Sequence, residues 1–172
     1  MRPEHPSRQR DGDLGSAPNR LPWPPMIYVA ATILAVAANH LRPLRLDMDP
    51  TFLRALGAAL LAVGLGLDVW AMITMSRCRA NILPHRAATA LVTTGPFAWS
   101  RNPIYLGNTI ALMGASLAFA NPWLMPAAII AAFAVLRLAI LREEVHLAMR
   151  FGTAWDRYRG RTARWFGKTG DR

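Results

Sequence analysis

The sequence predicts an all-α integral membrane protein with about four transmembrane helices. Of its 172 residues, 53% are hydrophobic and only 17% are charged, and the apolar residues come in long blocks. At ~1.5 Å per residue, blocks of this length cross most of a ~30 Å hydrocarbon core. The charged residues separate the blocks and gather at their ends, which is typical of a helical membrane protein.

The net charge of +10 would suit nucleic acid if the basic residues formed one soluble face. They lie between apolar blocks instead, so membrane topology explains them better, and we expect no nucleic-acid partner. The single cysteine, Cys78, excludes an internal disulfide and a cysteine-cluster metal site. The four histidines form no ligand-spaced pair, so we expect no metal.

The chain divides into three parts. Residues 1–22 are polar and rich in Arg, Pro, Gly and Asp, and they are expected to form a disordered cytoplasmic tail without the apolar core of a secretory signal. Residues 23–75 hold two membrane spans. Residues 76–172 are expected to hold a cofactor-binding loop, a helical hairpin and a C-terminal catalytic segment.

The first two spans are Trp23–Leu41 and about Phe52–Met75. The second span contains an ionisable residue, Asp68, which indicates either a functional site or a hydrogen bond between helices. It also contains small residues that let a neighbouring helix approach closely, namely Gly57, Gly64 and Gly66.

A long polar segment, residues 76–102, follows the second span. It ends in the stretch LVTTGPFAWSRNPIYLG, where Pro103 suits the first position of a helix. Arg101 and Asn102 then stand beside unpaired backbone N–H groups, which favours a carboxylate-bearing ligand. The alternative is a basic loop that only joins two spans. His85 could contact a ligand or act as a base, or it could be solvated.

The third and fourth spans, about Pro103–Ala120 and Trp123–Leu141, are joined by the short turn Asn121-Pro122, so they must form an antiparallel hairpin. The fourth helix continues into a charged amphipathic stretch that ends at a glycine stop, Gly152. The remaining tail mixes Arg with aromatic residues, which suits a segment lying on an anionic bilayer surface.

Two adjacent carboxylates, Glu143 and Glu144, lie just past the fourth span and point ~100° apart on a helix. Burying them without partners would be costly. They could therefore be a solvated helix end that pairs with Arg137, Arg142 and Arg150. Arg137 and Glu144 are seven residues apart, so an unbroken α-helix would place them on one face.

The basic residues also predict the orientation of the spans. With four spans, the segments expected on one side carry sixteen Lys and Arg residues, and those on the other side carry three. This asymmetry places both termini, residues 76–102 and the glutamate pair in the cytoplasm. We expect the protein in a bacterial inner membrane, in contact with the lipid bilayer.

An ordered set of residues resembles the pattern of the isoprenylcysteine carboxyl methyltransferase and phospholipid methyltransferase family. The set is Arg101, Asn102, Pro103, Tyr105 and Gly107, then Glu143-Glu144, Arg150-Phe151-Gly152, Tyr158 and Arg164-Trp165. The resemblance covers about residues 75–166. It implies an integral-membrane methyltransferase that binds S-adenosylmethionine on the cytoplasmic side. The implied cofactor pocket comprises Pro84, His85, Leu91, Gly95, Pro96, Arg101, Asn102, Tyr105, Gly107, Glu143 and Glu144.

The implied acceptor is a lipophilic small molecule, either a prenylcysteine-like carboxylate or a lipid amine. Arg137 or Arg150 could orient a carboxylate, whereas Glu144 or His85 could take a proton from an amine. We expect Glu143 to serve the cofactor and Glu144 to serve turnover. The other function classes are an NADPH-dependent reductase of the sterol-reductase type and a non-catalytic membrane scaffold.

Overall fold

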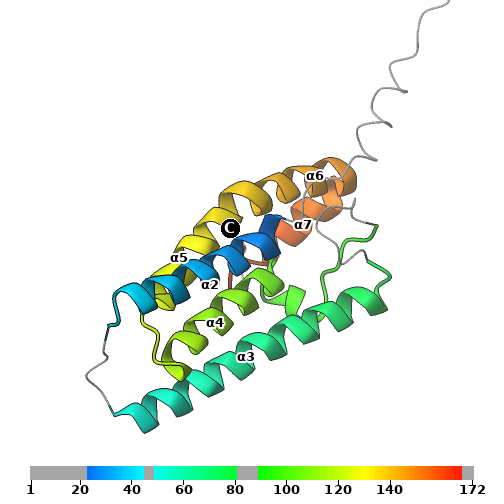
Figure 1. The fold of residues 1–172 in the computed structure, drawn as a ribbon. Coiled ribbons are helices and arrows are strands. Elements are labelled where there is room, and N and C mark those ends of the chain that lie inside the picture. Colours follow the sequence, from blue (N-terminus) through cyan, green and yellow to red (C-terminus); the bar gives the residue numbers. More distant parts are fainter. Residues whose placement is uncertain (1–22, 45–48, 81–88, 168–172) are drawn as a thin grey trace, which may run out of the picture.

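A computed structural model describes residues 23–44, 49–80 and 89–167. Within these residues the chain is helical and has no β-strand (Figure 1). The elements in order are α2 (Trp23–Leu41), α3 (Pro50–Arg77), the 3₁₀ turn η1 (Gly95–Ala98), α4 (Pro103–Ala118), α5 (Leu124–Val135), the π-helical turn η2 (Leu136–Ile140), α6 (Leu141–Phe151) and α7 (Thr153–Arg161).

The all-α membrane fold is confirmed. Three helical stretches of the described residues are long and apolar enough to cross a membrane: Pro24–Leu41, Pro50–Arg77 and Leu124–Phe151. The third of these runs through α5, η2 and α6 without a break. α4 belongs to the same bundle but is shorter than these stretches. Its 16 residues span only ~24 Å.

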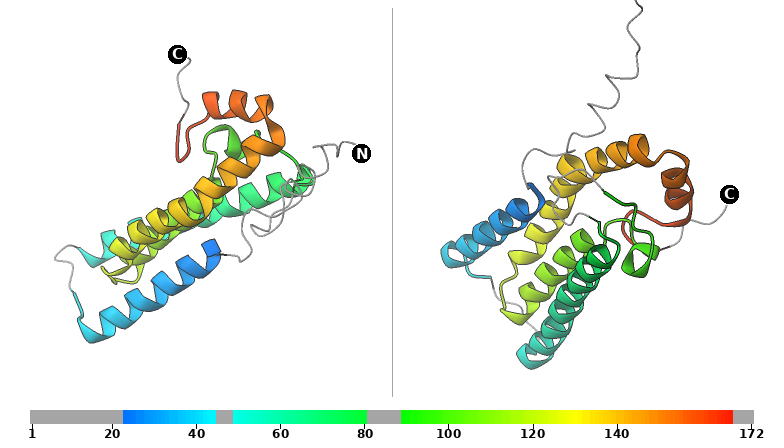
Figure 2. Two further views of the ribbon diagram at one scale, coloured as in Figure 1. Left: turned by 90° about the horizontal axis from the view of Figure 1, so that it is seen from above. Right: turned by 90° about the vertical axis from the view of Figure 1, so that its right-hand side faces the viewer.

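The long helices lie side by side in the order α2, α5, α4 and α3, as the right-hand view of Figure 2 shows. α4 and α5 form the expected hairpin. At its turn, the Ser116 hydroxyl donates to the Asn121 carbonyl at 2.9 Å, and the Asn121 side chain accepts from the Trp123 amide at 3.1 Å. These bonds satisfy backbone groups that the tight turn would otherwise leave unpaired.

Backbone contact between α3 and α4 depends on glycine. A Cβ atom added at Gly64 would lie 2.6 Å from the Gly107 carbonyl oxygen and 2.8 Å from the Ala111 Cα. Seven residues away on each helix, Gly57 and Gly114 repeat the same close approach. Gly66, in contrast, has open space around it. Two of the three glycines singled out from the sequence therefore define the helix interface.

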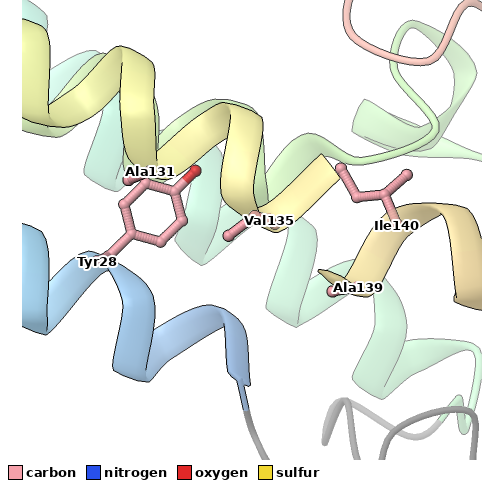
Figure 3. Packing of buried hydrophobic residues seen from close by; sticks show 5 residues of the cluster. All are labelled: Tyr28, Ala131, Val135, Ala139 and Ile140. Atoms are coloured by element: carbon pink, nitrogen blue, oxygen red, sulfur yellow. The ribbon is translucent and has the colours of Figure 1, made fainter. Parts of the chain in front are cut away.

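A buried cluster joins α2 to the continuous helix formed by α5, η2 and α6 (Figure 3). Tyr28 extends from α2 towards Ala131 and Val135 on α5, and Ala139 and Ile140 of η2 complete the cluster. The Tyr28 hydroxyl donates to the Tyr105 carbonyl at 3.0 Å and lies 2.8 Å from the Thr109 hydroxyl. The Tyr28 hydroxyl thus links α2 to α4, and it has hydrogen-bond partners although the side chain lies inside the bundle.

The glycine stop predicted after the fourth helix is present. α6 ends at Phe151, and Gly152 has φ +50°, a region that disfavours residues with a side chain beyond Cα. The chain then turns into α7, which lies with η1 at one end of the bundle (Figure 2). The reversal brings the C-terminal residues back over the segment that precedes α4.

Candidate functional site

The segment before α4 is held in place by the C-terminal end of the described chain. The Arg101 amide donates to the Ala163 carbonyl at 3.0 Å, and the Gly167 amide donates to the Trp99 carbonyl at 2.9 Å. The Asn102 side chain donates to the Arg164 carbonyl at 3.0 Å. Two segments some sixty residues apart therefore form one hydrogen-bonded unit, which we call the loop–tail unit (residues 97–102 and 162–167).

An ion network lies between this unit and α6. Glu144 accepts two hydrogen bonds from Arg164, from Nε at 2.8 Å and from Nη2 at 2.7 Å. The Arg101 Nη1 atom lies 3.1 Å from Oε1 of the same carboxylate, the oxygen that also accepts from Arg164 Nε. The bond to Glu144 raises the pKa of Arg164, whereas burial lowers the pKa of Arg101. One carboxylate thus pairs with two guanidinium groups, which leaves the trio with a net positive charge.

Arg101 is a charged residue with a largely buried side chain. Its side chain is only 10% exposed, and the guanidinium lies 5.6 Å from the ring centre of Trp155, a cation–π distance. Within the described residues, its Nε and Nη1 atoms have no hydrogen-bond partner of suitable geometry. A buried guanidinium with free donors is costly unless a ligand completes it.

Aromatic residues of α7 lie next to Arg101. Trp155 is 2% exposed, and its ring meets the ring of Tyr158 edge-on at 5.9 Å. The Tyr158 hydroxyl donates to the Phe97 carbonyl at 2.8 Å. Burial raises the pKa of Tyr158 well above its usual range, so this hydroxyl stays protonated and keeps its donor role at all ordinary pH values.

The second glutamate has a different partner. Glu143 accepts a hydrogen bond from the Tyr105 hydroxyl at 2.9 Å, which joins α6 to the first turns of α4. Glu143 and Glu144 therefore point in different directions, as expected for neighbours on one helix. Glu143 faces the bundle, and Glu144 faces the loop–tail unit.

Arg137 does not form an ion pair with Glu144. The π-helical turn η2 lies between them, and its wider turn shifts the residues that follow relative to an unbroken α-helix. The Arg137 guanidinium lies 5.1 Å from the ring centre of Phe133, which is 57% exposed on the outside of the bundle. Arg150, in the last turn of α6, is likewise exposed. Both arginines that were expected to orient the acceptor are thus exposed, and their role stays a prediction.

The remaining residues of the expected pocket fall into three groups. Leu91 and Gly95 are partly buried and Pro96 is buried; a Cβ at Gly95 would meet the Thr74 side chain of α3 at 2.9 Å. Gly107 faces Asp68 of α3 and admits that carboxylate at close range. Pro84 and His85 lie outside the described residues.

Asp68 is buried at this helix contact, and its Oδ1 atom has no hydrogen-bond partner within the described part of the chain. The close approach of Gly107 explains how a carboxylate fits between two helices. Of the two readings that the sequence left open, the hydrogen bond between helices is not seen for this atom.

Three contributors to the network were not among the expected site residues: Arg164, Trp155 and Tyr158. Tyr158 and Arg164 belong to the pattern that carries the family resemblance, but no site role was expected of them, and the tail was interpreted as a membrane-surface segment. Their inward orientation depends on the chain reversal at Gly152, and periodicity alone does not specify the direction of that reversal.

Comparisons with known proteins identify the family of the chain. A family model described as phospholipid methyltransferase matches residues 52–154, more than half of the chain. The nickel-cobalt-cadmium resistance protein NccN of Alcaligenes xylosoxydans xylosoxydans is 31% identical over 140 residues, which cover 81% of this chain and 61% of that protein. The chain thus spans about three fifths of that relative's length. No solved structure matches the chain.

Proposed function

The chain belongs to the phospholipid methyltransferase family, and we propose that it moves a methyl group from S-adenosylmethionine to a lipophilic acceptor at the cytoplasmic face of a membrane. Membership of the family supports methyl transfer in general. The donor, the acceptor and the side of the membrane are the proposal, and they rest on the residues of the ion network and on the charge asymmetry of the sequence.

The observation that carries the proposal is the incomplete coordination of Arg101. Its guanidinium is nine-tenths buried and lies near Trp155. Among the described residues its Nε atom lacks a hydrogen-bond partner, and its Nη1 atom has only the ion pair with Glu144 at 3.1 Å. A carboxylate is the group that best completes such a fork. The amino-acid end of S-adenosylmethionine carries one, so Arg101 would hold that end. When bound, this cofactor supplies a methyl group on a sulfonium centre.

The two glutamates would have separate tasks. Glu144 is already neutralised by Arg101 and Arg164, so its role is to position Arg101. Among the described residues, Glu143 accepts one hydrogen bond, from the neutral hydroxyl of Tyr105, so its carboxylate retains the capacity to accept a further hydrogen bond. That bond could come from the ammonium of the cofactor or from an amine acceptor. Methyl transfer would depend mainly on alignment of the reacting groups, which these residues would provide.

We expect Arg101→Ala to weaken the binding of S-adenosylhomocysteine by about 1.5–3 kcal/mol, the typical loss of a charged hydrogen bond. Isothermal calorimetry on the detergent-purified chain measures this, with NADPH as the comparison ligand for the reductase alternative. Arg159→Ala is the matched control, because Arg159 pairs with Asp156 on the exposed side of α7. Equal affinity in all three proteins would remove Arg101 from the pocket, and binding of NADPH alone would support the reductase.

The orientation of the site can be tested with the native cysteine. Cys78 is exposed at the end of α3, on the side that the charge asymmetry places in the cytoplasm. A membrane-impermeant maleimide should therefore label Cys78 only after the membrane is opened. In a Cys78→Ser background, a cysteine at the exposed Leu44 should be labelled in intact spheroplasts. The reverse pattern would place the site on the wrong side for a cytoplasmic cofactor.

A further inference from the structure

Two large aromatic side chains of the loop–tail unit remain exposed. Phe166 is 72% exposed and Trp99 is 51% exposed. The Gly167 amide donates to the Trp99 carbonyl at 2.9 Å, so the backbone at Phe166 runs beside the backbone at Trp99. Large aromatic side chains gain free energy when they leave water, so the depth of these two residues in the membrane decides what they contact.

The contact of η1 with α3 sets the depth of Trp99. A Cβ atom added at Gly95, the first residue of η1, would lie 2.9 Å from the Thr74 hydroxyl and 3.5 Å from the Trp70 Nε1 atom. This part of α3 is still apolar on the outside, because Trp70 and Ile73 are 52% and 44% exposed. Exposed apolar side chains of a spanning helix contact lipid. Trp99 directly follows η1, so it lies near the depth at which α3 leaves the bilayer.

Trp165 sets the depth of the tail independently. Its side chain packs against the buried cluster of Tyr28, Ala131, Val135, Ala139 and Ile140. This cluster lies inside the bundle, before the charged residues of α6 begin at Arg142. The chain therefore returns to the membrane after α6 has left it. Phe166 is the next residue along the chain, so it lies nearer to the hydrocarbon than the outer end of α6 does.

The chain around Phe166 is positively charged. Residues 157–166 contain four arginines and no acidic residue. Arg157 and Arg161 are exposed on α7, whereas Arg164 is held by Glu144. Aromatic rings beside arginines suit the lipid–water interface, because the rings enter the boundary between headgroups and acyl chains and the guanidinium groups attract anionic headgroups.

We propose that the loop–tail unit is an interfacial anchor, in which Phe166 and Trp99 insert at the lipid–water boundary of an anionic leaflet. Contact with lipid holds residues 162–167 against the bundle, and these residues carry Arg164 to Glu144. The bilayer thus helps to keep the ion network assembled. This inference rests on the membrane fold and on the depth of the two aromatic residues, and it is independent of the methyl-transfer reaction.

The first test measures the depth of residue 166. The full chain carrying Cys78→Ser and Phe166→Cys is labelled with bimane and reconstituted in vesicles of phosphatidylcholine and phosphatidylglycerol. We expect a nitroxide near the glycerol end of an acyl chain to quench the label more than a nitroxide at the chain terminus, and aqueous iodide to quench it weakly. Met149→Cys in the same background is the control, because this exposed residue lies near the outer end of α6 and should respond to iodide only. Quenching of the residue 166 label by iodide alone would overturn the proposal.

The second test measures what lipid contact does for the unit. In nanodiscs that contain phosphatidylglycerol, Phe166→Ser should speed hydrogen exchange at residues 162–167 about tenfold, the equivalent of ~1.4 kcal/mol. Phe119→Ser is the matched control, because Phe119 is 71% exposed at the opposite end of α4 and should leave that exchange unchanged. The unsubstituted chain should also exchange faster at residues 162–167 in phosphatidylcholine alone.

Two results of the exchange measurement would contradict the proposal. Unchanged exchange after Phe166→Ser would show that lipid contact does not hold the tail. Equal exchange of the unsubstituted chain in the two lipid compositions would show that the charge of the leaflet has no part in it.

Discussion

Replacing Gly64 with leucine should prevent α3 and α4 from packing, so we expect the variant to fail to fold. Even a single added Cβ would meet backbone atoms of α4, 2.6 Å from the Gly107 carbonyl oxygen. Backbone atoms cannot move aside as a flexible side chain can, so the two helices must separate. Gly64→Ala alone should cost about 1–3 kcal/mol of stability, the usual range for overpacking, and leucine should cost more.

Gly66 provides the matched control, because it lies on the same helix and no atom lies within 4 Å of its added Cβ. Gly66→Leu should fold normally, and Gly66→Ala should gain up to ~1 kcal/mol from helix propensity. Size-exclusion chromatography in mild detergent and thermal unfolding give the comparison. Similar yields and melting temperatures for the Gly64 and Gly66 variants would contradict the glycine-dependent contact.

The sequence could predict the helices because their signals are local. The first span was placed at Trp23–Leu41, the bounds that α2 has, and Pro103 began a helix as expected. The hairpin followed from the length of the Asn121-Pro122 turn. The glycine pattern indicated a close helix contact, but only the structure identifies which glycines face α4, since Gly64 and Gly66 differ by ~160° around the helix.

The site was less predictable because its contacts are distant in sequence. The expectation that Arg137 and Glu144 share a face assumed an uninterrupted α-helix, and the π-helical turn at Leu136–Ile140 has no simple sequence signal. Arg101 and Glu144 were both named from the sequence, and they do lie together. The second partner of Glu144, Arg164, depends on the return of the chain after Gly152, which local patterns do not encode.

Because the two glutamates have different partners, we expect their substitution to have different effects. Glu143→Gln keeps an oxygen that can accept from the Tyr105 hydroxyl, so we expect stability to change by less than about 1 kcal/mol. Any loss of cofactor affinity in this variant would then report a direct contact. The sequence alone had favoured turnover as the property that Glu144 controls, whereas its position between two arginines favours a positioning role.

Glu144→Gln should have the larger effect, because it leaves Arg101 and Arg164 without their shared counter-charge. Breaking a fully buried pair costs ~3–5 kcal/mol, and since Arg164 is 36% exposed we expect the lower part of that range. Residues 162–167 of the loop–tail unit should then detach. The affinity for S-adenosylhomocysteine should fall more than tenfold, because the lost interaction energy is larger than the ~1.4 kcal/mol that corresponds to a factor of ten. Hydrogen exchange at residues 162–167, thermal unfolding and calorimetry measure these effects.

A second substitution separates the positioning role from direct contact with the cofactor. Arg164→Gln in the Glu144→Gln background removes one of the two uncompensated charges, so stability should recover in part even though another ion-pair partner is lost. If Glu144 instead contacts the cofactor directly, the double variant should bind no better than the single one, and residues 162–167 should remain protected from exchange in both. Equal loss of stability in the Glu143 and Glu144 variants would contradict the assignment of different partners to the two carboxylates.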